Sequence, residues 1–280
     1  MRWILRGLAA LAGLILLVLV IVYAGSEWVI RKGHAVPLPA IAADRTPAGV
    51  AEGARLASAL GCRGCHGPQG NGRLIADVPG VIHVAPPALA PIVAGYSDGE
   101  LARLIRHGIK RDGHGAFIMP VEGHSHVADA DLARIIGWLR TLKPSAADRS
   151  DGLGFGPLGR FAVLTGKLKP EVSEAVHAPA KRPADTGRYI ADTVCAGCHS
   201  LTEDRKAHDD QRRVPPLLEV GPAYDLVAFR KLLRTGVGLS QRDLGLMGRV
   251  AKGDLSHLTE DEVAALHAFL EAEAMNAPAR

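Results

Sequence analysis

Aromatic side chains are scarce in this chain, because Phe, Trp and Tyr make up only 4% of its 280 residues. The cores of two small domains built from it would need something else to fill them. Basic clusters are lacking too: the formal net charge is +4, and no run of Lys and Arg is interleaved with aromatic residues. These absences argue against nucleic-acid binding. With 48% hydrophobic and 22% charged residues, neither a disordered chain nor a multi-span membrane protein fits the composition.

One long hydrophobic run is present, at the N-terminus. Between Arg6 and Glu27 lie 20 consecutive uncharged residues, enough for a helix of roughly 30 Å, the thickness of the hydrocarbon core of a bilayer. Aromatic residues typical of membrane interfaces flank it, namely Trp3, Tyr23 and Trp28. We expect residues 1–30 to be a transmembrane anchor in a bacterial inner membrane, with the rest of the chain facing the periplasm. A cleaved signal peptide is the alternative, since Val22-Tyr23-Ala24 suits a cleavage site.

Cysteine is also rare, but none of the four cysteines is isolated. Cys62-Arg63-Gly64-Cys65-His66 and Cys195-Ala196-Gly197-Cys198-His199 are two copies of C-x-x-C-H, the attachment pattern of c-type haem. Two thiols at this spacing can form thioethers with the two vinyl groups of haem, and the adjacent His then faces the iron. The sequence therefore predicts two covalently bound haem c groups, held by Cys62, Cys65 and His66 and by Cys195, Cys198 and His199.

Other uses of paired cysteines fit less well. A thioredoxin-like redox protein needs only one C-x-x-C, beside a βαβ pattern that is not evident here. A zinc site built from four cysteines would place its pairs closer together and would not need a His after each. Two structural disulfides are compatible with export, but they would not explain the His that follows each pair.

An internal repeat links the two motifs. Residues 105–109 and 233–237 match at an offset of 128 residues, as do Met119 and Met247. Pro86-Pro87 recurs as Pro215-Pro216 at an offset of 129, and the C-x-x-C-H motifs recur at 133. Small drifts of this kind are typical of loop-length changes in a duplicated domain.

Each copy predicts the same series of helices, and neither contains convincing alternation for strands. A first helix leads into the motif, a second ends at a glycine, a loop carries the methionine, and an amphipathic helix closes the copy. The expected helix starts are Thr46, Ser97, Asp185, Asp225 and Thr259, and the expected stops are Gly108 and Gly236. The expected buried faces of the closing helices are Leu132, Ile135, Ile136 and Leu139, and Val263, Leu266, Phe269 and Leu270.

This order of motifs and helices resembles class I cytochrome c, twice over. The resemblance implies a mainly α fold with two tandem cytochrome c domains after the N-terminal helix, at residues 45–143 and 185–273, joined by a Pro-, Gly- and Ala-rich linker at 144–184. In that family the motif His and a downstream Met bind the iron from opposite sides, which implies His66 with Met119 and His199 with Met247. A proline carbonyl of the family accepts a hydrogen bond from the motif His. Here this implies Pro87 and Pro216, with Pro86 and Pro215 one residue away.

Histidines are the rival iron ligands. The candidates are His107, His114, His124, His126, His208 and His257. Most of them are expected on exposed loops or helix surfaces. His124 and His126 lie near Met119 in the sequence, which keeps bis-His ligation open.

A haem with both axial positions filled has no open site for a substrate, so the chain is expected to be an electron-transfer protein rather than an enzyme. It is similar to the cytochrome subunits of membrane-bound periplasmic dehydrogenases, although those often carry three haems. The partners implied are a dehydrogenase subunit as donor and a small cytochrome or terminal oxidase as acceptor, beside the membrane itself. The alternative is a di-haem cytochrome c peroxidase, in which one haem opens to peroxide. A methionine in both copies argues against that asymmetry.

Overall fold

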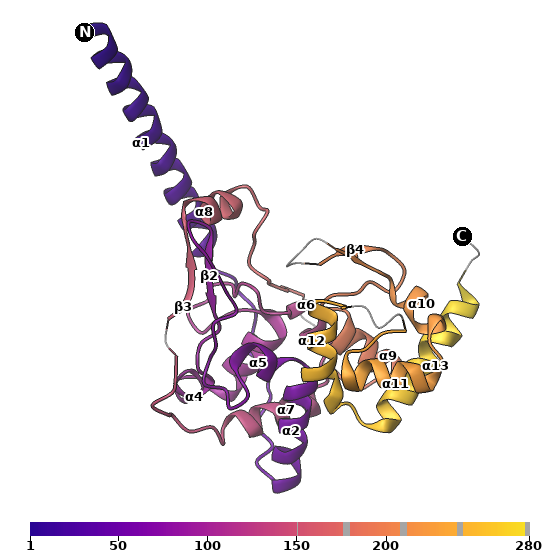
Figure 1. The fold of residues 1–280 in the computed structure, drawn as a ribbon. Helices are drawn as coiled ribbons and strands as arrows, with labels where there is room; N and C mark the ends of the chain where they lie inside the picture. The colour runs from indigo at the N-terminus through magenta and orange to yellow at the C-terminus, as the bar shows by residue number, and fades with distance from the viewer. Residues whose placement is uncertain (150, 176–179, 208–211, 240–242, 278–280) are drawn as a thin grey trace.

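The computed structural model describes residues 1–149, 151–175, 180–207, 212–239 and 243–277, and its fold is mainly helical. Helix α1 (Arg2–Ile30) projects as a rod from a body made of two halves (Figure 1). Only Val22 and Ser26 of α1 are buried. By length and composition α1 can cross a membrane, although a signal sequence near an N-terminus would meet the same test.

In the first half of the body, two long helices pack against each other. Its helices are α2 (Pro47–Ala59), α3 (Cys62–His66), α4 (Leu89–Ala94), α5 (Asp98–His107), α6 (Val121–His124) and α7 (Asp129–Leu139). Thr46 caps α2 and Ser97 forms a capping box with Glu100, as the sequence predicts. Gly53 lets α2 approach α7 closely, because a Cβ there would lie 1.9 Å from the Arg134 carbonyl oxygen. The predicted apolar face of α7 is buried.

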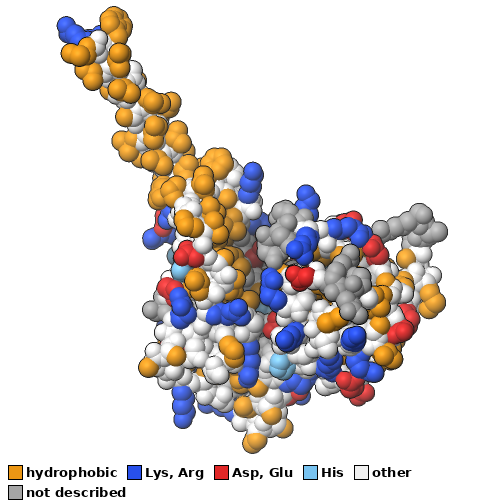
Figure 2. Space-filling view, in the orientation of Figure 1, with side chains coloured by type: hydrophobic (Ala, Val, Ile, Leu, Met, Phe, Trp, Pro, Cys, Tyr) orange, Lys and Arg blue, Asp and Glu red, His pale blue; other side chains and the backbone are white. Residues whose placement is uncertain are grey.

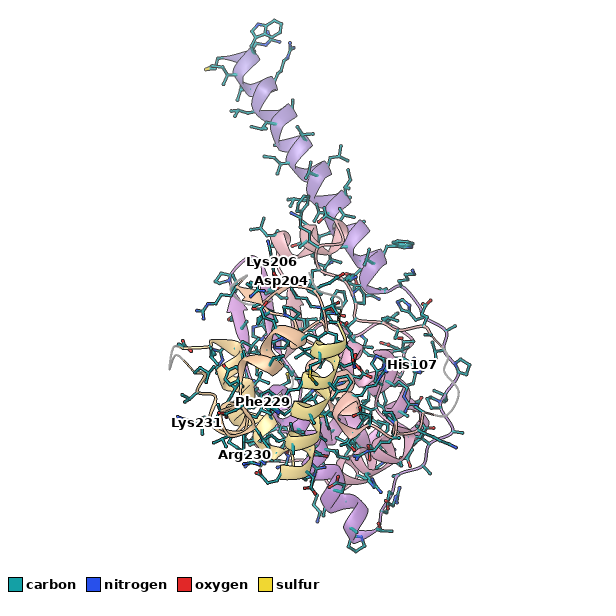
Figure 3. All side chains as sticks on the ribbon, turned by 90° about the vertical axis from the view of Figure 1, so that its right-hand side faces the viewer. His107, Asp204, Lys206, Phe229, Arg230 and Lys231 are labelled. Atoms are coloured by element: carbon teal, nitrogen blue, oxygen red, sulfur yellow. The ribbon has the colours of Figure 1, made fainter. Side chains whose placement is uncertain are left out.

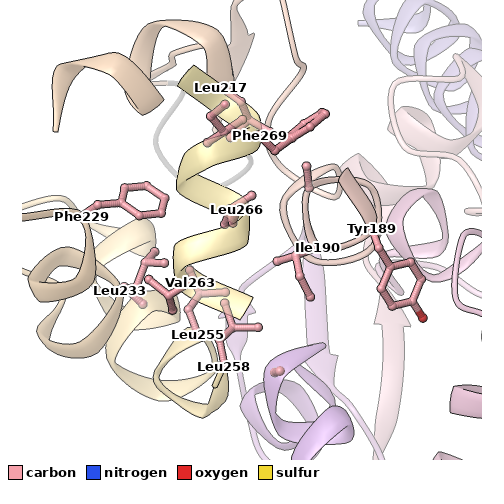
Figure 4. Packing of buried hydrophobic residues seen from close by; sticks show 14 of the residues in the cluster. Tyr189, Ile190, Leu217, Phe229, Leu233, Leu255, Leu258, Val263, Leu266 and Phe269 are labelled. Carbon is pink, nitrogen blue, oxygen red and sulfur yellow. The ribbon is translucent and has the colours of Figure 1, made fainter. Parts of the chain in front are cut away.

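The second half is also built mainly of short helices. It contains α9 (Thr186–Ile190), a π-helical turn (Ala191–Cys195), α10 (Leu217–Val220), a 3-10 turn (Gly221–Ala223), α11 (Leu226–Thr235), α12 (Leu246–Gly253), a 3-10 turn (Leu255–His257) and α13 (Glu260–Asn276). Asp185, Asp225 and Thr259 cap their helices as expected. The buried face of α13 packs against Phe229 and Leu233 of α11 (Figure 4). The helix starts and buried faces predicted for this half are confirmed.

The expectation that strands are missing is wrong. β1 (Ala76–Val78), β2 (Ile82–Ala85) and β3 (Gly152–Phe155) form an antiparallel sheet, in which Ile82 pairs with Phe155. β4 (Arg205–Lys206) pairs with β5 (Arg213–Val214). These strands are too short to show alternation, and β3 comes from the segment expected to be a linker.

The segment at 144–184 is attached to the first half and to α1. After β3 it forms α8 (Pro157–Leu164), which packs along α1. It then passes over the first half, where the amide of Glu171 donates to the Ala116 carbonyl oxygen and that of Ser173 to the His107 carbonyl oxygen. The segment is therefore a structural part of the body rather than a free tether.

A buried polar cluster joins the two halves. Asp131 on α7 is 1% exposed and accepts hydrogen bonds from Tyr189 Oη at 2.7 Å, Arg182 Nε at 2.7 Å and Arg134 Nη1 at 3.0 Å. Tyr189 Oη in turn accepts the Ala128 amide at 3.0 Å. A buried carboxylate is stable only when it is hydrogen-bonded in this way.

Replacement of Tyr189 by Phe tests this cluster. The variant leaves the Ala128 amide without its acceptor and Asp131 without one donor, so the free energy of unfolding should fall by about 1–3 kcal/mol. Denaturant titration measures the loss. Tyr96→Phe is the matched control, because the Tyr96 hydroxyl also accepts a backbone amide, that of Arg111, but in an exposed place. Equal losses in the two variants would contradict a special role for the Asp131 cluster.

Candidate functional site

The first C-x-x-C-H motif forms the short helix α3, which begins after Gly61 and ends at Gly67. His66 Nδ1 lies 2.8 Å from the Pro87 carbonyl oxygen, the contact expected for Pro87. A carbonyl can only accept, so Nδ1 carries the proton and Nε2 is the nitrogen that suits a metal. Burial lowers the pKa of His66, partly opposed by this hydrogen bond, so the imidazole is neutral at pH 7, as ligation requires.

The second motif makes the equivalent contact through a different proline from the one expected. His199 Nδ1 lies 2.8 Å from the carbonyl oxygen of Pro215 rather than Pro216. The reason is the way in which the two halves correspond. α4 begins at Leu89 and α10 at Leu217, and the amides of these two residues donate to the carbonyl oxygens of Gly70 and Ser200. Equivalent residues of the two halves are therefore 128 positions apart here, as the two methionines are. Alignment of the two Pro-Pro pairs at an offset of 129 is wrong by one residue.

A cavity of about 870 Å³ opens beside the second motif. Cys195, Cys198, His199 and Met247 all line it, so the structure brings together the four residues predicted from the sequence. Most of the remaining wall is apolar and comes from α10, α11, α12 and α13, including Leu217, Phe229, Leu233, Val250, Leu266 and Leu270. The volume is at the upper end of the roughly 300–1,000 Å³ of ligand sites. A large apolar cavity with the C-x-x-C-H residues and a thioether on its wall fits haem.

The cysteines do not gather into a metal site. Among the described residues, no group of three or more His, Cys, Asp or Glu side chains is placed so that it could hold a metal ion. No disulfide joins the four cysteines, all of which lie in the described part of the chain. The geometry therefore supports neither the zinc nor the disulfide alternative.

Met119 lies in the first half on a strained loop. It is half-buried and packs against the same hydrophobic core as Cys62. The preceding residue, Ile118, has a φ of 62°, a left-handed conformation that is unfavourable for a β-branched residue. Such strain often occurs at functional sites, where the surrounding structure holds a side chain in place.

A comparison of two variants measures this strain. Ile118→Gly and Ile118→Ala remove the same half-exposed side chain, but only glycine adopts a positive φ without cost. We expect Ile118→Gly to be about 1 kcal/mol more stable than Ile118→Ala in thermal or denaturant unfolding. Equal stability of the two variants would show that the loop is not strained at this position.

Most of the rival histidines in the described part of the chain lie elsewhere or have other partners. His107 Nδ1 lies 2.9 Å from the Ser173 carbonyl oxygen, well away from Phe229 of the cavity wall (Figure 3). His114 pairs with Asp112, and His126 and His257 are exposed. His208 lies outside the described residues. His124 is buried, and its Nε2 lies 3.2 Å from the Leu60 carbonyl oxygen. Its Nδ1 is buried without a hydrogen-bond partner among the described residues, so His124 remains the rival ligand in the first half.

Each motif lies against the opposite half across the interface between the halves. A Cβ on Gly64 would lie 2.7 Å from the carboxylate of Asp254, which follows α12, and one on Gly197 would lie 3.5 Å from Pro120, which precedes α6. Burial raises the pKa of the Cys65 thiol, and the nearby Asp254 carboxylate and Cys198 sulfur raise it further. Each motif is thus covered by the segment that follows the methionine of the other half. The sequence carried a signal for the first of these contacts, because the close approach needs a glycine at position 64 inside the motif.

Charged side chains stabilise this interface. Arg205 Nη2 lies 2.7 Å from Glu122 Oε1 on α6, and Arg205 Nη1 donates to the Ala196 carbonyl oxygen inside the second motif at 2.9 Å. On the other side, burial raises the pKa of Asp254 to about 6. Sequence reasoning missed Arg205 and Asp254, since nothing in the local pattern marks them.

Comparison with known families identifies part of the chain. Residues 50–143 match the family model of cytochrome c. A search of curated proteins found no match to the chain. The first half therefore contains a cytochrome c domain, a family that carries covalently bound haem c and transfers electrons.

Proposed function

We propose that this chain, whose first half contains a cytochrome c domain, is a membrane-anchored di-haem c-type cytochrome that transfers electrons in the periplasm. One observation carries the proposal: in both halves the C-x-x-C-H histidine directs Nδ1 to a proline carbonyl oxygen at 2.8 Å. This repeated geometry supports a haem in the second half as well as in the first. The iron ligands are His66 with Met119 and His199 with Met247.

When bound, haem supplies one-electron redox chemistry. The residues of the chain would bind the haem, orient the ligands and tune the potential. The carbonyl groups of Pro87 and Pro215 fix the tautomer and orientation of the two imidazoles, which strengthens them as ligands. The thioethers of Met119 and Met247 favour reduced iron and raise the potential. If His66 with Met119 and His199 with Met247 hold the two irons, no position on either iron would be left for a substrate, which supports a carrier rather than an enzyme.

The position of each motif against the other half supports transfer within the molecule. Gly64 lets the first motif approach the second half closely, the second motif lies near Pro120 of the first half, and the Cys198 sulfur is near enough to raise the pKa of Cys65. An electron accepted at one site can therefore be passed to the other without a separate docking step. Two linked sites suit a protein that relays electrons between a donor and an acceptor.

The donor and acceptor in this proposal are other redox proteins at the same membrane. In this proposal α1 holds the chain in the inner membrane with both halves in the periplasm. The length and apolar composition of α1 support the anchoring. A dehydrogenase subunit supplies the electrons, and a small cytochrome or terminal oxidase of the respiratory chain receives them. The resemblance to the cytochrome subunits of periplasmic dehydrogenases supports this placement.

A spectroscopic redox titration of the full chain, purified with its haem, tests the proposal. We expect two low-spin one-electron centres, both at the higher potential typical of His/Met ligation, with spectra unchanged by peroxide or carbon monoxide. A single centre would refute the di-haem assignment. One centre at far lower potential that turns high-spin when the other is reduced would favour the di-haem peroxidase instead.

A further inference from the structure

Helix α8 packs against the C-terminal end of α1 and forms polar contacts with it. Arg160 Nη1 lies 2.9 Å from Glu27 Oε2 and 3.1 Å from Ser26 Oγ, and its guanidinium lies 4.7 Å from the centre of the Tyr23 ring. Leu164 packs on Gly25, where a Cβ would be 2.6 Å from its Cδ1. These contacts come from four consecutive or nearly consecutive positions of α1, so they hold α8 at one level along that helix.

This level is where the apolar part of α1 ends. The uncharged run closes at Ser26, and Glu27 is the first charged residue after it. If the run spans the roughly 30 Å hydrocarbon core of a bilayer, residues 23–27 lie at the boundary between hydrocarbon and headgroups. Tyr23 and the exposed Trp28 are the aromatic residues expected there. α8 therefore lies at the same boundary.

The outer face of α8 is apolar and exposed to solvent. Leu158 is 65% exposed and Phe161 50% exposed, and residues three apart lie on the same face of a helix. The opposite face is turned to the protein: Val163 is buried, and a Cβ on Gly159 would lie 2.0 Å from the Val81 carbonyl oxygen. Hydrophobic side chains continue from α1 onto the part of the body where α8 packs (Figure 2).

Exposed lysines accompany this apolar face. Lys32 follows α1, and Lys167 and Lys169 follow α8. An apolar helix face with basic residues at its border is typical of a helix that lies in the interface of an anionic bilayer.

We propose that the outer face of α8 inserts Leu158 and Phe161 into the surface of an anionic lipid bilayer, as a second membrane contact beside α1. This inference rests on the proposed anchoring by α1. A single helix leaves the body free to swivel about its axis, whereas two contacts fix which side of the body faces the membrane. The haem sites would then be presented to soluble partners in one orientation.

Cysteine accessibility in nanodiscs tests the contact. The haem-loaded full chain is placed at one copy per disc in phosphatidylcholine and phosphatidylglycerol, where its own cysteines are held as thioethers. Leu158→Cys and Phe161→Cys are each reacted with a charged, membrane-impermeant maleimide. Val227→Cys is the matched control, because Val227 is an apolar side chain on α11 that is 72% exposed. Ile15→Cys, in the middle of α1, reports on the anchor.

We expect Leu158→Cys and Phe161→Cys to react at least about tenfold more slowly than Val227→Cys. Each variant keeps the other large apolar side chain, and burial of that side chain in lipid favours the inserted state by this order. Ile15→Cys should be protected more strongly still. Protection of Ile15→Cys with free reaction at 158 and 161 would overturn the α8 contact and leave the anchor intact. Rapid reaction of Ile15→Cys would refute the anchor itself. Protection at 158 and 161 that appears only with several copies per disc would show that another protein surface covers α8.

Discussion

The double variant Cys195→Ser/Cys198→Ser should contain one covalently bound haem per chain instead of two. The serine hydroxyls cannot form the thioethers, so His199 and Met247 alone would have to retain the group. The alkaline pyridine haemochrome spectrum, divided by the protein concentration, measures this stoichiometry. Cys62→Ser/Cys65→Ser is the reciprocal variant and should also retain one haem.

The same variant should lose the fixed structure of its second half. Without haem, the apolar wall of a cavity of about 870 Å³ would be left against water or empty space, and either state costs free energy. A whole domain is stable by only about 5–15 kcal/mol, so the half collapses or unfolds rather than keep the cavity. Limited proteolysis should cut within residues 185–277 and leave the first half resistant. A variant with unchanged haem content and protease resistance would contradict the second haem site.

Replacement of the methionine ligands should change one centre at a time. Met119→Ala and Met247→Ala each remove a thioether that favours reduced iron, so the potential of one centre should fall by about 0.1–0.3 V, within the roughly 0.8 V range that axial ligands span. Each variant also leaves one axial position without a protein ligand, so the reduced protein should bind one carbon monoxide. Redox titration and carbon monoxide difference spectra make the two measurements.

The chain offers a control for this pair. Met275 is 80% exposed near the end of α13, so Met275→Ala should leave both potentials unchanged and carbon monoxide unbound. The double variant Met119→Ala/Met247→Ala should bind two. If Met119→Ala left its centre unchanged, a histidine would be the ligand in the first half, and His124 would be the residue to replace next.

Local patterns in the sequence determined much of this protein. Each C-x-x-C-H motif is complete within five residues, and the helix starts at Thr46, Ser97, Asp225 and Thr259 depend on side chains that cap their own helix. Residues three or four apart also define the buried faces of α7 and α13. Such features could be read in advance because the interacting groups are neighbours in the chain.

Contacts between distant residues were decided only by the tertiary structure. Which of two adjacent proline carbonyls reaches His199 depends on the path of a whole loop, and the sequence alignment chose Pro216 where the structure uses Pro215. β3 is visible only through its pairing with β2, and the bond between Tyr189 and Asp131 joins residues 58 apart. The packing of each motif against the opposite half, and that of α8 on α1, likewise depends on surfaces that are far apart in the chain. Neither local propensity nor periodicity specifies which of these surfaces meet, because their packing is settled only when the whole body is assembled.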